Sequence, residues 1–141
     1  MTEARPAAGQ EEVVAALALR HLVFVVEQGV APDLELDGRD GDAEHLVAVR
    51  DGRVVGTCRL LHEGGRTKLQ RMAVERALRG QGIAGVLLDE AERAARRAGS
   101  ARVDLSAQIR AVDVYARAGY AAQGPVYLEA GIEHRDMTKD L

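Results

Sequence analysis

The sequence has few of the residues that crosslink small folds or hold proteins in membranes. Its 141 residues include one cysteine, three prolines, no tryptophan and 3% aromatic residues. Because Cys58 is alone, no internal disulfide is possible, and no Cys or His cluster indicates a metal site, so we expect no bound metal. No apolar run approaches the ~20 residues of a membrane span, and the first residues lack the order of a signal peptide. We therefore expect a soluble cytoplasmic protein with no membrane partner.

The charge balance is slightly acidic, with 19 Lys and Arg residues against 22 Asp and Glu residues and a formal net charge of −3. A protein that binds nucleic acid through a broad basic face carries the opposite balance, so we expect no nucleic-acid partner. The composition still allows a local basic pocket. The length suits one hydrophobic core, and we predict a single domain over residues 1–141.

Hydrophobic periodicity and turn signals divide the chain into strands and helices. Residues 10–27 predict a helix, although the β-branched end HLVFVVEQG leaves a strand as the alternative there. Asp51-Gly52 predicts a hairpin within residues 45–61, and Ala130-Gly131 lies between two more strands. The remaining expected elements are a short edge strand at most within residues 1–9, a strand over 67–74, a helix over 81–98, a strand over 101–107 and a short helix over 109–118. This order predicts an α/β (α+β) fold with helices on the faces of a mixed sheet.

Residues 29–43 form the one long acidic loop of the sequence. Its carboxylates are Glu35, Asp37, Asp40 and Asp42. The loop is either a solvated surface segment or an attractor of a cationic amine. Arg59 and Arg71 belong to predicted strands, where an arginine either faces a polar cleft or lies at an exposed edge.

The segment Arg79-Gly80-Gln81-Gly82-Ile83-Ala84 joins a predicted strand to a predicted helix. Free N–H groups and the positive dipole end of a helix make an anion site, and Arg79 adds a fixed charge. A phosphate-binding P-loop is not expected, because its G-x-x-x-x-G-K-[ST] motif is absent and neither Lys nor Ser/Thr follows Gly82. Residues 80–85, GQGIAG, match the G-x-G-x-x-G fingerprint literally, but dinucleotide folds place that motif in their first strand-to-helix turn, whereas here it lies mid-chain. A tight turn that merely needs glycine remains an alternative.

Two longer segments resemble one protein family. Residues 72–84, MAVERALRGQGIA, resemble the [Q/R]-x-x-G-x-[G/A] signature of the GNAT superfamily of acetyl-CoA-dependent N-acetyltransferases, met here by Arg79, Gly82 and Ala84. VYARAGY, residues 114–120, resembles the later Tyr-x-x-x-Gly-[Phe/Tyr] segment. FVVEQGV, ELDGRDGDAEHLVA, SAQ and AGIEHRDM are similar to the ElaA-like branch of bacterial GNAT proteins. The resemblance implies a single GNAT-type domain with a mixed, mostly antiparallel sheet flanked by helices.

The resemblance also implies acetyl-CoA as the acetyl donor and assigns residues to it. The backbone of one strand would hold the pantetheine arm, the N–H groups of the glycine segment would hold the diphosphate, and a polar side chain would lie near the thioester. These residues are Met72, Ala73 and Val74 for the arm, Arg79, Gly80, Gln81, Gly82, Ile83 and Ala84 for the diphosphate, and Gln108 for the thioester or substrate. An exposed helix cap is the alternative for Gln108.

Attack of a neutral amine on a thioester requires a base, a donor to the oxyanion and an acid for the leaving thiolate. Tyr115 matches the family's tyrosine acid, with simple packing under the short helix as the alternative, and the Val74 N–H is the implied oxyanion donor. Glu27 and His134 lie in the ElaA-like segments and are the candidate bases; histidine titrates near working pH. A surface carboxylate at a helix end and a structural or exposed histidine are the respective alternatives.

We therefore expect an enzyme that moves an acetyl group to a primary amine of a small molecule or peptide in a ternary complex. The alternative is a non-catalytic acyl-CoA-binding sensor or interaction module. Homodimers are common in the superfamily and are one expected assembly, although no apolar face in the sequence indicates one. The pattern does not identify the amine.

Overall fold

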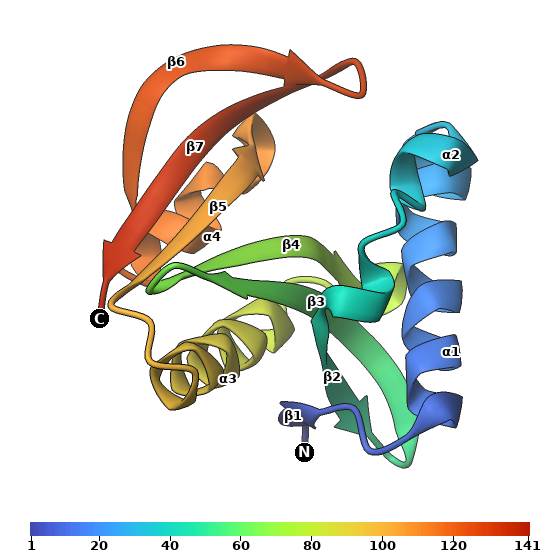
Figure 1. Cartoon of the computed structure of the whole chain (residues 1–141). Helices are drawn as coiled ribbons and strands as arrows, with labels where there is room; N and C mark the ends of the chain where they lie inside the picture. The colour runs from blue at the N-terminus through green and yellow to red at the C-terminus, as the bar shows by residue number, and fades with distance from the viewer.

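The computed structural model describes residues 1–141 as one seven-stranded sheet with helices on both faces (Figure 1). The strands are β1 (Glu3–Pro6), β2 (Glu44–Arg50), β3 (Arg53–Glu63), β4 (Arg66–Val74), β5 (Arg102–Gln108), β6 (Ala121–Glu129) and β7 (Ile132–Asp140). The helices are α1 (Gln10–Arg20), α2 (Pro32–Glu35), α3 (Ile83–Arg97) and α4 (Val112–Arg117). The strand order is β1-β2-β3-β4-β5-β7-β6, and only β4 and β5 pair in parallel. The predicted mixed, mostly antiparallel sheet is confirmed.

Both predicted hairpins form at the expected turns. Asp51 and Gly52 have φ values of 53° and 74°, and Ala130 and Gly131 have 51° and 76°. Two consecutive residues with positive φ suit the twist of a two-residue hairpin, which explains the glycine at the second position of each turn. These turns set the registers of β2 with β3 and of β6 with β7.

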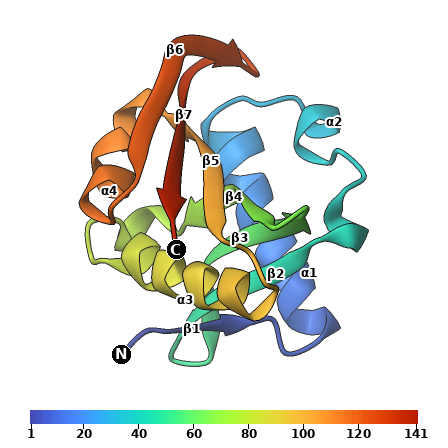
Figure 2. The same ribbon diagram turned by 60° about the vertical axis from the view of Figure 1, so that its left-hand side comes forward.

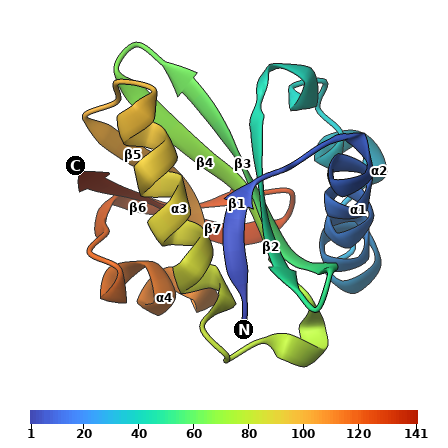
Figure 3. The same cartoon turned by 90° about the horizontal axis from the view of Figure 1, so that it is seen from below.

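The helices form two layers. Helices α3 and α4 lie on one side of the sheet, and α1 and α2 lie on the other, as the views in Figures 2 and 3 show. The main core lies between α3 and the sheet, with α3 contributing Leu87, Leu88, Ala91, Ala94 and Ala95. A smaller cluster of Leu19, Val23 and Ala73 lies under α1.

The helix predicted over residues 10–27 is present, so the alternative of a strand at its end is wrong. Helix α1 continues into a π-helical segment, His21–Glu27, which buries Val23 and leaves Leu22 and Val26 exposed. The acidic loop after it contains α2 and a short 3₁₀ turn at Asp40–Asp42.

Strands β4 and β5 separate partway along their length. They pair only from Arg66 with Arg102 to Leu69 with Leu105. A bulge follows in β4, where Arg71 takes a φ of +59° and the register with β3 shifts. Beyond it, β4 follows β3 while β5 follows β7, so the sheet opens between the two central strands (Figure 1).

Candidate active site

A cleft of about 930 Å³ occupies the opening between β4 and β5. It brings together most of the residues that the sequence singled out: Met72, Val74, Arg79, Gly80, Gly82, Ile83, Ala84, Gln108, Tyr115 and His134. Ala73, Gln81 and Glu27 do not line it. The side chain of Ala73 packs under α1, and Gln81 accepts a hydrogen bond from Arg50 at 2.8 Å.

The end of β4 offers an unpaired backbone edge to this cleft. The Glu75 N–H donates to the Val55 carbonyl at 2.9 Å, so alternation along the strand turns the N–H and carbonyl of Val74 away from β3. Its carbonyl accepts a hydrogen bond from Arg79 Nε at 3.1 Å. Because β5 has already diverged, the Val74 N–H faces the opening rather than a neighbouring strand. An extended ligand can pair with such an edge.

The glycine segment forms a row of free donors at the start of α3. Gly80 and Gly82 both have a φ of +83°, which favours glycine, and a Cβ at either position would meet nothing within 4 Å. The N–H groups of residues 80–85 donate to no protein acceptor, and the first backbone bond of the helix runs from Val86 to Gly82 at 3.2 Å. Free donors and the helix dipole together suit an anion such as a diphosphate.

Tyr115 reaches the cleft from α4, which lies on the same side of the sheet as α3 (Figure 3). Tyr115 is only 7% exposed, and its ring packs edge-on against the ring of Tyr120 with 6.2 Å between centroids. Its hydroxyl makes no hydrogen bond to protein and is not fully enclosed, so it faces the cleft. Burial raises the pKa of the Tyr115 hydroxyl above its ordinary value, which keeps it protonated at neutral pH.

A polar cluster fixes the end of α4 behind Tyr115. The Tyr120 hydroxyl donates to Glu92 of α3 at 3.2 Å, and Lys139 of β7 donates to the same carboxylate at 2.9 Å. Lys139 also donates to the Ala118 carbonyl at 2.8 Å, directly after α4. Helix α4 is therefore tied to α3 and β7, which sets the position of the Tyr115 ring.

His134 lies on the opposite wall, in β7. Its Nδ1 lies 2.6 Å from the Ile132 carbonyl, which can only accept, so we assign the proton to Nδ1 and a free lone pair to Nε2. The ring stacks on Tyr127 with 6.1 Å between centroids, and Nε2 is 3.6 Å from Glu129. The Tyr127 hydroxyl contacts Ser106 and donates to Asp136 at 2.6 Å.

Glu27 lies outside the cleft that contains Tyr115 and His134. Both of its carboxylate oxygens accept hydrogen bonds from Arg79, at 2.6 and 2.8 Å, and this pairing lowers the pKa of Glu27. It lines a smaller neighbouring pocket of about 500 Å³ that also includes Gln28 and Gln108. Gln108 donates to Gln28 across the cleft at 2.8 Å, and its side chain caps no helix.

Comparisons with known proteins identify the family of this chain. A family model described as the acetyltransferase (GNAT) domain matches residues 8–141. The chain belongs to the GNAT acetyltransferase family. It is 34% identical over 135 residues to the uncharacterized N-acetyltransferase YjcF of Bacillus subtilis (strain 168), covering 95% of this chain and 96% of YjcF.

Two solved structures confirm the fold and the branch. An acyl-CoA N-acyltransferase from Pseudomonas aeruginosa is 38% identical with a TM-score of 0.82, over 99% of this chain and 98% of that one. Escherichia coli ElaA is 27% identical with a TM-score of 0.86, over 99% of this chain and 100% of that one. The predicted resemblance to the ElaA-like branch is confirmed.

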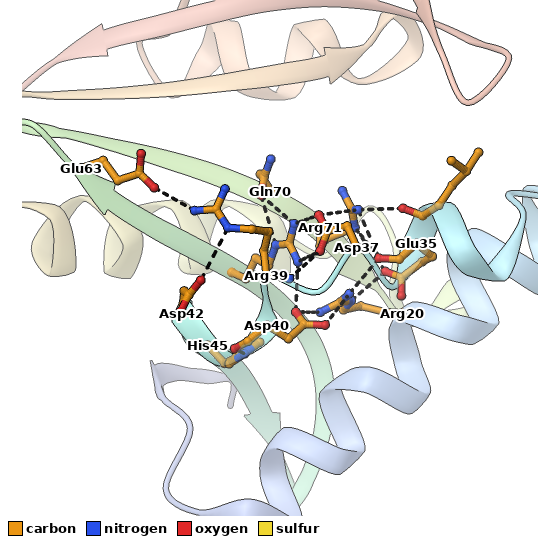
Figure 4. A network of polar contacts seen from close by, with 12 residues as sticks. Arg20, Glu35, Asp37, Arg39, Asp40, Asp42, His45, Glu63, Gln70 and Arg71 are labelled. Carbon is orange, nitrogen blue, oxygen red and sulfur yellow. Dashed lines mark hydrogen bonds and ion pairs between the residues drawn. The ribbon is translucent and has the colours of Figure 1, made fainter.

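Next to the cleft, this GNAT domain carries a buried network of ion pairs (Figure 4). Arg59 of β3 is fully buried and donates to Asp37 at 2.8 Å, to Asp40 at 3.1 Å and to Gln70 at 2.8 and 3.1 Å. Arg20 of α1 is 1% exposed and pairs with Glu35 at 2.8 Å and with Asp40 at 2.6 Å. These ion pairs hold the acidic loop against α1 and β3.

This network corrects the prediction for the acidic loop. Glu35 is buried and Asp40 is half-buried, and the two buried arginines hold both of them. Asp37 pairs with Arg59, but its side chain stays 30% exposed and lines the cleft. Asp42 matches the solvated alternative, with its side chain 73% exposed. Arg59 lies inside the network, whereas Arg71 lies at its edge, where it contacts Glu35 and Asp37 and also lines the cleft.

Several cleft residues were missed by sequence reasoning: Ser106, Tyr127, Asp136 and Gln70. A signal for some of them was present, since Ser106 and Gln108 alternate with buried residues in β5. They pair with Asp136 and His134 of β7, so the four side chains share one face of the sheet. No cluster of three or more His, Cys, Asp and Glu side chains is arranged to hold a metal ion. None of the helices has the length and apolar character needed to cross a membrane.

Replacing Arg59 with Met should destabilise the fold strongly. The change removes every donor that Arg59 gives to Asp37 and Gln70, and breaking a buried pair in this way costs about 3–5 kcal/mol in the free energy of unfolding. Urea unfolding at neutral pH measures it. Arg39→Met is the matched control, because Arg39 is 45% exposed in its pair with Glu63 and should change stability by no more than about 1 kcal/mol. Equal losses in both variants would contradict a buried network.

The same network predicts how stability depends on pH. The Arg59 guanidinium holds the pKa of Asp37 well below its ordinary value, so in acid the unfolded chain takes up this proton before the folded protein does. The stability that Asp37 contributes is therefore present above about pH 4 and is lost as the pH falls through the folded pKa. Asp37→Asn should flatten the decline in unfolding free energy as the pH falls from about 4 to about 2. An unchanged dependence of the unfolding free energy on pH would show that ionised Asp37 does not stabilise the fold.

Proposed function

We propose that this GNAT domain is an acetyl-CoA-dependent N-acetyltransferase that transfers the acetyl group to a primary amine of a small molecule or peptide. Transfer would occur by direct attack of the amine within a ternary complex. The observation that carries the proposal is that one cleft holds an unpaired β4 edge, a row of free N–H donors at residues 80–85 and the free hydroxyl of Tyr115. Each feature suits a different part of an acyl-CoA thioester.

The diphosphate of acetyl-CoA would bind at the start of α3. The N–H groups from Gly80 to Ala84 donate to nothing else in the protein, and the helix dipole adds to their attraction for an anion. Arg79 would supply charge from its place beside the loop, although its guanidinium is engaged by Glu27. Local, oriented donors allow a protein of net negative charge to bind this anion.

The pantetheine arm would add to the open edge of β4 as a further strand, as the family resemblance implies for Met72, Ala73 and Val74. Of these, Met72 and Val74 line the cleft. The Val74 N–H would donate to the thioester carbonyl oxygen, on which negative charge develops during attack. A fixed backbone donor at that point lowers the barrier because it needs no reorganisation during the reaction.

Tyr115 would act as the acid. As the amine nitrogen bonds to the thioester carbon and the carbon–sulfur bond breaks, the leaving thiolate takes the phenolic proton. The raised pKa of Tyr115 keeps this proton in place until the thiolate forms. Gln108 would be a polar contact at the same end of the cleft.

His134 would be the base that receives the proton from the amine. With its Nδ1 proton donated to the Ile132 carbonyl, Nε2 carries the lone pair that this task requires, and Glu129 at 3.6 Å would stabilise the charged ring. Glu27 is the second candidate, as a base acting through water or as an amine-binding group. It would first have to leave Arg79, and its lowered pKa makes it the weaker base.

We place the enzyme in the cytoplasm, which suits its single, buried and unpaired cysteine. A homodimer remains a prediction, as does a peptide rather than a small molecule as the acceptor.

Tyr115→Phe tests the proposal. The variant should lower kcat for thiol release from acetyl-CoA by about 10²- to 10⁴-fold with an amine panel, the usual contribution of a positioned acid. Stability and coenzyme A affinity should hardly change, because the hydroxyl bonds to no protein group.

Tyr120→Phe is the matched control. Its hydroxyl bonds to Glu92 outside the cleft, so the variant should lose stability. Lys139 still links Glu92 to the end of α4, which keeps the Tyr115 ring in place, so the rate should stay close to that of the parent. Equal rates for the parent and Tyr115→Phe would contradict an acid role for Tyr115. Coenzyme A binding without thiol release to any amine would favour the acyl-CoA-binding module instead.

A further inference from the structure

Two side-chain donors in β4 face the cleft without a protein acceptor. Gln70 Nε2 and Arg71 Nη1 make no hydrogen bond, although both residues line the cleft and neither atom is fully enclosed. Figure 4 shows both side chains at the edge of the buried network that faces β5 and β7. Adjacent free donors on one strand form a surface that suits a bidentate anion.

The orientation of the Gln70 amide is fixed by the residue beneath it. Arg59 has only donors, so Gln70 must present its oxygen to it, and Oε1 accepts from Nε at 3.1 Å and from Nη2 at 2.8 Å. The amide nitrogen is then forced outward into the cleft. Because Arg59 is itself held by Asp37 and Asp40, this orientation is built into the fold before any ligand arrives.

Arg71 is held mainly by backbone carbonyls, with one longer hydrogen bond to the Asp37 carboxylate at 3.4 Å. Its Nη2 donates to the carbonyls of Leu34 and Glu35 at 3.2 and 3.1 Å. The two carboxylates near it, Glu35 at 3.3 Å and Asp37 at 3.4 Å, each have a closer arginine partner in Arg20 or Arg59. Lys68, two residues before Gln70, also lines the cleft and pairs with no carboxylate. Lys68 and the Nη1 of Arg71 are therefore the cationic groups that this face of β4 leaves free for a ligand.

The position of these donors relates them to the proposed reaction. The bulge at Arg71 turns consecutive side chains toward the acidic-loop side of the sheet, and Met72, next along the chain, lies where the pantetheine arm would bind. Four carboxylates line the cleft, and two of them, Glu35 and Asp37, are already paired with Arg20 and Arg59. Glu129 and Asp136, in β6 and β7, pair with no arginine or lysine, so they repel an anion and attract an ammonium group. The free carboxylates and the free cationic groups thus lie on different strands.

We propose that Gln70 and Arg71 form a carboxylate-binding subsite, so that the acceptor is an amine that also carries a carboxylate, as an amino acid or a short peptide does. That the bound molecule is the acetyl acceptor rests on the proposed function. Carboxylate binding itself needs only the protein and no coenzyme A. Gln70 Nε2 and Arg71 Nη1 donate to the two oxygens of the carboxylate, which places the amine of a small amino acid near the thioester end of the cleft.

The test is a titration followed by the side-chain amide signal of Gln70 in ¹⁵N-labelled protein. It is run without coenzyme A, so that its outcome does not depend on cofactor binding or turnover. The probes are mixtures of free L-amino acids, matched mixtures of the corresponding decarboxylated amines, and dipeptides with a free or amidated C-terminus. A saturable shift with the carboxylates and none with the decarboxylated amines is expected. The dipeptide pair then shows whether a free amino acid or a peptide end is preferred.

Two variants sharpen the test. Gln70→Glu keeps an oxygen for Arg59 and replaces the outward donor with an acceptor, while Arg71→Gln removes the charge. Each should weaken carboxylate binding by about 10- to 100-fold, the range for a hydrogen bond to a charged group, as followed by the shifts of neighbouring backbone amides. Arg71→Lys should keep part of the affinity. Thermal unfolding checks that each variant is folded.

Two results would overturn the subsite. One is a shift of the Gln70 amide signal that is equally large with the decarboxylated amines and with the carboxylates. The other is the absence of a saturable shift at Gln70 with every carboxylate probe in folded parent protein. Because acetyl-CoA binding is measured separately, either result would leave the proposed acetyl transfer standing, whereas failure to bind acetyl-CoA would leave the subsite standing.

Discussion

The divergence of two neighbouring strands is the constraint on which the site depends. Strands β4 and β5 run in parallel and pair only as far as Leu69 and Leu105. Had they stayed paired, Val74 would have no free N–H and Tyr115 would face a closed sheet. The opening is stable because each strand keeps its other neighbour: β4 stays with β3, and β5 with β7. Backbone groups left unpaired in this way are costly unless a ligand or water satisfies them, so the opening is itself a binding feature.

The buried ion pairs give this opening a fixed wall. Arg59 and Arg20 pin the acidic loop against the sheet, and the loop carbonyls in turn hold Arg71. Ion pairs are expensive to bury, and apolar residues could fill the same volume. What an apolar filling would not provide is the orientation of Gln70, whose oxygen is drawn down toward Arg59. The network therefore connects fold stability to the geometry of the acceptor side.

Much of the fold was predictable because local rules and tertiary packing agree. The apolar stripe of α3 and the Asp51-Gly52 and Ala130-Gly131 turns gave the right elements, and the glycine segment gave a row of donors at a helix start. The π-helical end of α1 was ambiguous, because its β-branched residues suit a strand by propensity and a helix by packing.

The polar contacts were not predictable from pattern alone. A carboxylate in a Gly- and Asp-rich loop looks solvated until its partner is known, and Asp37 lies 22 positions from Arg59. Glu27 and Arg79 are 52 positions apart, so the ion pair that engages both was out of reach of sequence reasoning. The Tyr127–Asp136 contact depends on a bulge in β6 that shifts its register with β7. Such pairs are set by three-dimensional packing, which periodicity does not encode.

Acetyl-CoA binding to the row of N–H donors is the central claim, and calorimetry on the parent, Gly82→Ala and Gly82→Asp tests it most directly. Both substitutions add a Cβ at a φ of +83° that meets no atom within 4 Å, and aspartate tolerates this φ at least as well as alanine. Only aspartate puts a negative charge where the diphosphate would bind. We predict binding by the parent, weaker binding by Gly82→Ala, and none by folded Gly82→Asp. Equal affinity in the alanine and aspartate variants, or no binding by the folded parent, would contradict the account.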